Sequence, residues 1–168
     1  MGFENPLFGS KVLIFDTGPL WEFILFQAVH DFGLAHLEPD LHEMKTNAQF
    51  QRLSSYIGGF RTRTTTPHVV AEVSYWIEKA EKRSPRGAIW RMTYDQFFQM
   101  QMDERLIKLL DMPRETVTNF GATDTSVLEL GRSMAPDRPT ILTIEKALFG
   151  KCHREGLSAV QLATVISN

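Results

Sequence analysis

The sequence predicts an α/β domain in which helices flank a central, mainly parallel sheet. Short apolar runs that favour β structure occur at positions 11–15, 139–143 and 157–162, and longer segments of helical periodicity separate them. The chain has 168 residues, of which 43% are hydrophobic, and domains commonly contain roughly 100–150 residues. We therefore expect residues 1–168 to form a single domain.

The first of these runs has the pattern of a buried strand that leads into a helix. Residues 11–15 end abruptly at Asp16-Thr17-Gly18-Pro19, and Pro19 suits the first turn of a helix. Leu20–Val29 is the most apolar stretch of the chain. It is much shorter than the ~20 residues that a membrane span requires, so we expect a core helix and no membrane partner.

Two further helices are predicted in the middle of the chain. Residues 42–56 favour a weaker helix, which Gly58-Gly59 closes. Thr66 and Pro67 are typical of an N-cap and a first helical position, and they begin a helix predicted to reach about Arg83.

The second half of the chain continues the alternation. Residues 90–102 favour a helix, whereas the aliphatic residues of 105–110 indicate a short strand. A helix is expected over 124–133, and another begins near Glu145 and ends at Gly156.

Composition limits the kinds of function. The 18 basic and 20 acidic residues give a net charge of −2, so a polyanionic partner must be met locally or through metal ions. Cys152 is the single cysteine, which excludes an intramolecular disulfide and a cysteine-rich zinc cluster. The first residues lack the basic start and apolar stretch of a secretion signal. A cytoplasmic location is therefore expected.

Four acidic residues occupy unusual positions. Asp16 and Glu145 follow predicted strands, and ligand crevices form at the carboxyl ends of parallel strands. Glu72 is predicted to lie on the apolar stripe of its helix with Val69, Val73 and Trp76, and Asp124 shares a helix face with apolar residues.

Each of these acids also has an ordinary structural interpretation. Asp16, Asp124 and Glu145 suit helix capping, and Glu72 is within reach of an ion pair with Lys79. One explanation nevertheless covers all four, because carboxylates that point at each other around a cation form a hard oxygen site. Such a site selects Mg²⁺ or Mn²⁺.

These acids lie in motifs that together resemble the PIN (PilT N-terminus) nucleases. Residues 12–20 resemble the opening motif, in which a strand delivers the first metal-binding aspartate, here Asp16. Residues 66–72, 124–131 and 141–148 resemble the second, third and fourth motifs, in the family's order. The fourth motif departs from the family, because Glu145 stands where aspartate is usual, and the segment around 38–65 resembles an insertion.

The resemblance implies a fold, an activity and partners. It implies a three-layer PIN-like fold and a metal-dependent endoribonuclease, similar to the VapC-type toxins, that hydrolyses RNA phosphodiester bonds. Asp16, Glu72, Asp124 and Glu145 would be both the metal ligands and the catalytic residues. An antitoxin protein and a homodimer are further expectations. A PIN-like module that binds RNA or protein without turnover remains the alternative, and DNA remains open as a substrate.

Hydroxyl and basic residues supply the remaining candidates. Thr17 and Thr143 are candidates for supporting the carboxylates or contacting phosphate, although both also suit ordinary turn and strand-end roles. Candidate nucleic-acid contacts are basic residues near the predicted glutamate helix, which also suit a solvated helix end: Arg61, Arg63, Lys79, Lys82, Arg83, Arg86 and Arg91.

Overall fold

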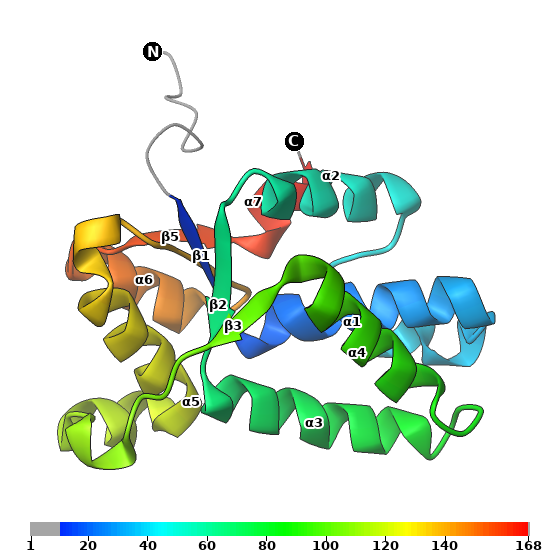
Figure 1. The fold of residues 1–168 in the computed structure, drawn as a ribbon, viewed down its shortest axis with the longest axis horizontal. Coiled ribbons are helices and arrows are strands. Elements are labelled where there is room, and N and C mark those ends of the chain that lie inside the picture. The colour runs from blue at the N-terminus through cyan, green and yellow to red at the C-terminus, as the bar shows by residue number, and fades with distance from the viewer. Residues whose placement is uncertain (1–10, 168) are drawn as a thin grey trace.

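The structure, a computed structural model, describes residues 11–167 and contains one five-stranded sheet (Figure 1). All its strands are parallel, in the order β3-β2-β1-β4-β5. They are β1 (Val12–Phe15), β2 (Thr62–Thr65), β3 (Met102–Glu104), β4 (Thr140–Thr143) and β5 (Ser158–Gln161). The predicted α/β class is confirmed, while the N-terminal stretch that was compared with secretion signals lies outside the described residues.

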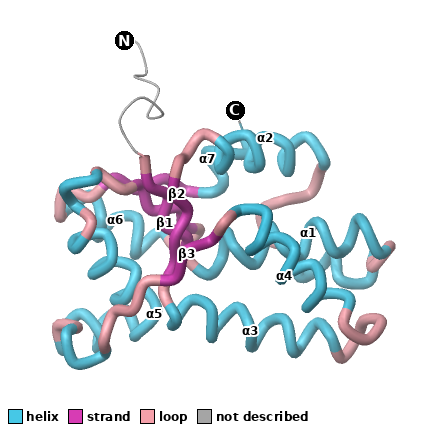
Figure 2. The backbone as a smooth tube through the Cα atoms, in the orientation of Figure 1, coloured by secondary structure: helices cyan, strands magenta, loops and turns pink. Residues whose placement is uncertain are grey.

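Helices cover both faces of the sheet (Figures 1 and 2). In the view of Figure 1, α5 and α6 lie to the left of β1, β2 and β3, α1 and α4 to the right, α3 along the bottom, and α2 packs with α7 at the top. The helices are α1 (Thr17–Phe32), α2 (Asn47–Gly58), α3 (Pro67–Glu81), α4 (Ala88–Met100), α5 (Arg114–Ser133), α6 (Lys146–Arg154) and α7 (Leu162–Ser167). Short 3-10 turns are η2 (Ala35–Asp40), η3 (Leu109–Asp111) and η4 (Ala135–Asp137).

The central strand explains the first apolar run. β1 pairs with β2 on one side and β4 on the other, and all four of its residues are buried. A strand covered on both faces requires apolar side chains in both directions, which is why Val12–Phe15 shows no polar alternation. The strand ends at Phe15, and the backbone N–H of the next residue, Asp16, donates a hydrogen bond to the carbonyl of Leu142 at 3.1 Å.

The helix predicted over 42–56 begins later than expected, at Asn47. Thr46 caps it and forms a capping box with Gln49. The preceding residues are not helical because the buried carboxylate of Glu22 accepts hydrogen bonds from the backbone N–H groups of residues 42–44. Those N–H groups are therefore held by a side chain of α1.

The prediction of a strand over 105–110 was wrong. The strand lies earlier, at Met102–Glu104, and Leu109–Asp111 forms a 3-10 turn. Leu106, Leu109 and Leu110 are exposed by 67%, 57% and 96%, so the aliphatic content of this segment does not mark a core strand. The segment at 90–102 is confirmed as mainly helical, since α4 spans Ala88–Met100.

Two elements were not predicted, and one helix is longer than predicted. β2 is a polar Thr-Arg-Thr-Thr sequence that occupies an inner position in the sheet, and α7 follows β5 directly. α5 begins at Arg114 and is interrupted at Gly121, where φ is 82° and ψ is 169°. Glycine adopts this backbone conformation without the steric cost that a side chain would add.

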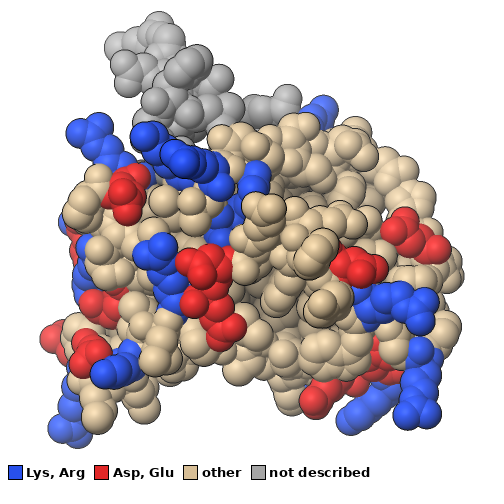
Figure 3. All heavy atoms as spheres, in the orientation of Figure 1, with Lys and Arg blue, Asp and Glu red and all other residues tan. Residues whose placement is uncertain are grey.

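Acidic and basic side chains are interspersed on the surface. On the face shown in Figure 3, blue and red groups lie beside each other among uncharged atoms, and no broad basic surface forms. This distribution agrees with the net charge of −2. Binding of a polyanion through bulk electrostatics is therefore not favoured on this face.

Candidate functional site

Asp16 lies at the carboxyl end of the central strand and caps α1. Its Oδ1 accepts a hydrogen bond from the backbone N–H of Thr17 at 2.7 Å, and its Oδ2 accepts one from Thr143 Oγ1 at 2.6 Å. The residue is only 2% exposed. Burial raises the pKa of Asp16 to about 6, against the opposing effect of those two hydrogen bonds, and the charges of Glu72 and Glu145 raise it further.

Glu72 approaches the same place from α3. Thr17 Oγ1 donates a hydrogen bond to Glu72 Oε2 at 2.9 Å, so Thr17 contacts Asp16 through its backbone and Glu72 through its side chain. The apolar stripe that was predicted to contain Glu72 lies slightly to one side, because the buried residues of α3 are Val69, Val73, Ile77 and Ala80. Glu72 is partly exposed at the edge of this stripe, and Trp76 is 40% exposed.

Asp124 lies in α5, just after the break at Gly121, so it occupies the first turn of a new helical segment. Burial raises the pKa of Asp124 to about 7, and the charges of Asp16, Glu145 and Glu72 contribute in the same direction. Its carboxylate makes no hydrogen bond or ion pair within residues 11–167. This electrostatic repulsion indicates that the four carboxyl groups lie near one another.

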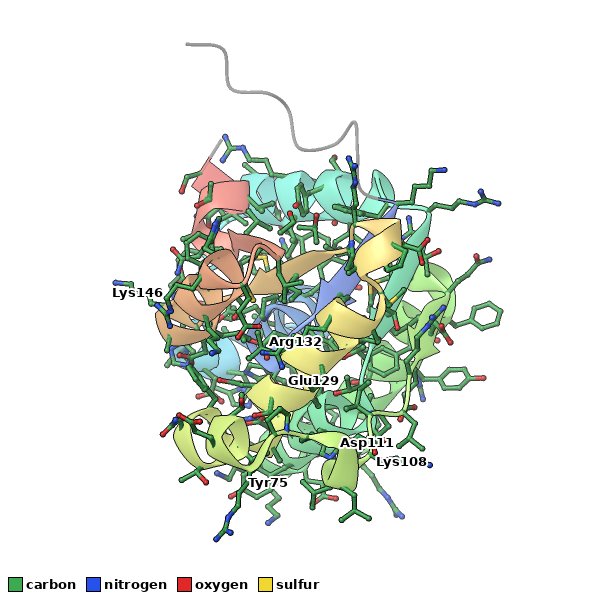
Figure 4. All side chains as sticks on the ribbon, turned by 90° about the vertical axis from the view of Figure 1, so that its left-hand side faces the viewer. Tyr75, Lys108, Asp111, Glu129, Arg132 and Lys146 are labelled. Carbon is green, nitrogen blue, oxygen red and sulfur yellow. The ribbon has the colours of Figure 1, made fainter. Side chains whose placement is uncertain are left out.

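An ion-pair network holds the helices that carry Asp124 and Glu145. In Figure 4, Glu129 and Arg132 lie close together on α5, and they form an ion pair. Arg132 also donates from Nε to Glu155 Oε2 at 2.8 Å, just beyond the end of α6. The network joins α5 to α6 across one face of the sheet.

Glu145 is the N-cap residue of α6, and its side chain is exposed. Thr143 is buried behind it, and Thr143 Oγ1 accepts a hydrogen bond from the backbone N–H of Glu145 at 2.9 Å. The neighbouring Ile144 packs so closely on Gly18 that a β-carbon at Gly18 would collide with it. Glycine at this position therefore allows the start of α1 to approach the β4–α6 turn.

One pocket of about 650 Å³ collects these groups. Its lining includes the four predicted carboxylates and Thr17. None of the four carboxylates forms an ion pair with a described residue. As placed, however, no three or more His, Cys, Asp or Glu side chains within residues 11–167 form a group that could hold a metal ion.

The basic candidates divide into two groups. Lys79 and Arg83 line the pocket, whereas Lys82, Arg86 and Arg91 are exposed elsewhere and are not part of its lining. Arg83 forms an ion pair with Asp40, which also lines the pocket. Arg61 and Arg63 also lie outside the lining, and Arg63 donates to the Ile57 and Gly58 carbonyls at the end of α2.

Several pocket residues were not predicted from the sequence. They are Gly18, Trp21, Pro39, Asp40, His42, Trp76 and Ile144. Trp76 carries a signal that was available, because it follows Glu72 by four residues, which places both on one side of a helix. Asp40 and His42 carry no such signal, because the distant Glu22 fixes their segment.

No family model matches the chain, and no curated protein matches it. The resemblance to the PIN nucleases therefore rests on the sequence motifs alone. Within residues 11–167, no helix has both the length and the apolar character needed to cross a membrane.

Proposed function

We propose that the chain is a divalent-metal-dependent endoribonuclease of the PIN type. The observation that carries the proposal is the convergence of Asp16, Glu72, Asp124 and Glu145 on one pocket at the carboxyl edge of a parallel sheet. These four acids come from four separate parts of the fold. Unpaired carboxylates repel each other and resist burial, so their proximity calls for a compensating cation.

The donor chemistry fits Mg²⁺ or Mn²⁺, because all four groups offer hard oxygen atoms. Asp16 and Glu72 are already oriented by hydrogen bonds from Thr143 and Thr17. No hydrogen bond within residues 11–167 fixes the orientation of the Asp124 and Glu145 carboxylates. When bound, a divalent cation would stabilise charge on the phosphodiester and activate water for its hydrolysis.

The side chains around the acids support work on a phosphodiester. Lys79 lines the same pocket and makes no ion pair with a described residue, so it is available to a phosphate oxygen. The raised pKa of Asp124, about 7 without metal, means that a cation bound by this carboxylate would displace a proton near neutral pH.

The decisive test is cleavage of a mixed RNA pool by the purified protein with Mn²⁺, with EDTA, and with the Asp124→Asn variant in parallel. Cleavage that requires both Mn²⁺ and Asp124 supports the proposal. A parallel pool of single-stranded DNA separates a ribonuclease from a general nuclease. Uncut RNA and DNA across several metals would refute it.

One observation favours a second candidate, a PIN-like module that binds RNA or a protein without cleaving. No group of three His, Cys, Asp or Glu side chains within residues 11–167 is positioned to hold a metal ion. RNA binding that is equal with Mn²⁺ and with EDTA, together with the absence of cleavage, would support this module.

A narrower form of the proposal is the toxin of a toxin–antitoxin pair, acting in the cytoplasm. Growth arrest when the chain is expressed, relieved by the product of a neighbouring gene, is the expected behaviour. Growth arrest that Asp16→Asn abolishes would tie the toxicity to the acidic site. Normal growth at high expression of an active nuclease would instead support an RNA-processing role.

A further inference from the structure

The outer half of the pocket differs in chemistry from the acidic half. Along α3, Glu72 is followed on the pocket side by Trp76 and Lys79, and Arg83 lines the pocket just beyond the end of this helix. At a rise of 1.5 Å per residue, Trp76 lies about 6 Å and Lys79 about 10 Å from Glu72 along the helix axis. A carboxylate, an aromatic ring and a cation therefore succeed one another along one wall of the pocket.

Trp76 is a supported and accessible aromatic surface. It is 40% exposed, whereas Trp21, which also lines the pocket, is only 6% exposed and lies behind it. The two ring centroids are 6.4 Å apart with an interplanar angle of 35°. A ring that is already held by its neighbour loses little side-chain entropy when a ligand stacks on it.

The ammonium group of Lys79 lies over this ring and over that of Tyr75. Its Nζ lies 5.1 Å from the Trp76 ring centroid and 4.3 Å from that of Tyr75. It forms no ion pair within residues 11–167, in contrast to Arg83, which pairs with Asp40. An ammonium group next to an exposed indole matches the two parts of a nucleotide, since the base stacks and the phosphate is anionic.

We propose that this wall binds an unpaired nucleotide of single-stranded RNA, with the base stacked on Trp76 and a phosphate beside Lys79. The assignment to RNA rests on the proposed function. A base inside a duplex is stacked on both faces and cannot reach Trp76, so the wall selects single strands. The volume of about 650 Å³ is that of a pocket for a small ligand and admits one nucleotide next to the acids.

Binding without turnover tests this inference. Every protein carries Asp16→Asn in addition to the variant under study, and the probe is a short fluorescent single-stranded RNA in Mg²⁺, measured by anisotropy. We expect Trp76→Leu to weaken binding about tenfold, the scale of one base–aromatic stack. Trp90→Leu is the matched control, because Trp90 is 41% exposed but belongs to α4 and does not line the pocket.

Two further measurements exclude a merely structural effect. Trp76→Phe keeps a ring and is expected to recover most of the affinity. Lys79→Gln is expected to reduce the slope of log K against log salt by about 0.7, the value for one phosphate contact with a single strand. Lys108→Gln, at an exposed lysine outside the pocket, is expected to leave the slope unchanged.

The outcomes separate this inference from the proposed function. The inference would be overturned if Trp76→Leu and Trp90→Leu reduced the affinity for single-stranded RNA equally. It would also be overturned if the protein bound a duplex of the same sequence with equal affinity, even if the unsubstituted protein cleaves RNA. A selective loss in Trp76→Leu would uphold it even if no metal supports cleavage, and the nuclease proposal alone would then fail.

Discussion

Asp16 and Asp124 make the stability of the metal-free protein depend on pH. Their pKa values in the folded chain are about 6 and about 7, above the usual 3.8. Between those values the folded state binds more protons than the unfolded state, so stability falls as the pH rises through this window. We expect the free energy of unfolding to decrease from about pH 4 to about pH 7, with Asp16 contributing on the order of 1–3 kcal/mol.

Urea unfolding of the EDTA-treated protein across this pH range measures how steeply the free energy of unfolding falls with pH. Asp16→Asn provides the control, because asparagine keeps the cap on Thr17 but cannot ionise. The decrease should be clearly smaller in this variant. A slope that is the same in both proteins would show that Asp16 is not the group responsible.

Thr17 is expected to act as a positioning residue. Thr17→Val preserves shape but removes the hydroxyl that holds Glu72, so Glu72 loses its fixed orientation. We expect cleavage to fall about tenfold, the effect of losing about 1.4 kcal/mol of orientation, with little change in melting temperature. Thr17→Ser restores the hydroxyl and should restore most of the rate. Failure of the serine variant to recover activity would contradict this role.

The sequence identified the residues that gather at this pocket better than it predicted their contacts. Asp16, Glu72, Asp124, Glu145, Thr17 and Thr143 were all identified as candidates. That Thr17 bonds Glu72 and Thr143 bonds Asp16 was not foreseen, because those contacts span 55 and 127 residues of sequence. Only the packing of α3 and β4 against the start of α1 creates them.

At the scale of elements, Glu22 fixes the segment that leads into α2. It is fully buried, and its two oxygens accept the backbone N–H groups of His42, Glu43 and Met44. Glu22→Gln keeps the volume but replaces a charged acceptor by an amide, which leaves buried N–H groups poorly satisfied. We expect a loss of about 2–4 kcal/mol, measured as a decrease in melting temperature of roughly 5–15 °C.

Glu38→Gln, at an exposed glutamate of η2, is the control and should change the melting temperature little. Because His42 and Asp40 line the pocket, Glu22→Gln should also weaken RNA binding. An unchanged melting temperature in Glu22→Gln would show that the segment is held by other contacts.

A second carboxylate that binds backbone N–H groups, as Glu22 does, explains why some element boundaries could not be predicted. Glu81 at the end of α3 accepts hydrogen bonds from the N–H groups of Gly87, Ile89 and Trp90, so it caps α4 from outside. In the sequence, Glu81 only dilutes a basic stretch, and Glu22 only interrupts an apolar one. Periodicity detects side chains that face a core, but it cannot detect which distant carboxylate satisfies a helix end.

β2 is a buried strand that the hydrophobic pattern of the sequence does not reveal. Its sequence is polar, yet Thr64 and Thr65 are fully buried, and Thr65 Oγ1 donates to the carbonyl of Phe15 at 2.9 Å. Threonine is β-branched and fits a strand, but four residues without aliphatic side chains provide no hydrophobic pattern. The position of β2 between β1 and β3 depends on its neighbours.

For the whole molecule, the proposed function predicts that a divalent cation stabilises the fold by bringing the four carboxylates together. A ligand at 100 times its dissociation constant adds about 2.7 kcal/mol when it binds only the folded state. For a chain of this size we expect Mn²⁺ to raise the melting temperature by roughly 5–10 °C. EDTA should reverse the change, and Asp124→Asn should greatly reduce it. An increase of the same size in Asp124→Asn would indicate binding at another place.

The order of strands across the sheet also determines when the site is completed during synthesis. β1 lies in the middle, with β2 and β3 on one side and β4 and β5 on the other. The ribosome therefore delivers three adjacent strands, with Asp16 and Glu72, before Asp124 and Glu145 have been made. On the proposed function, a nascent chain that has only reached β3 carries half of a site. Such a chain cannot cut the messenger RNA from which it is being translated.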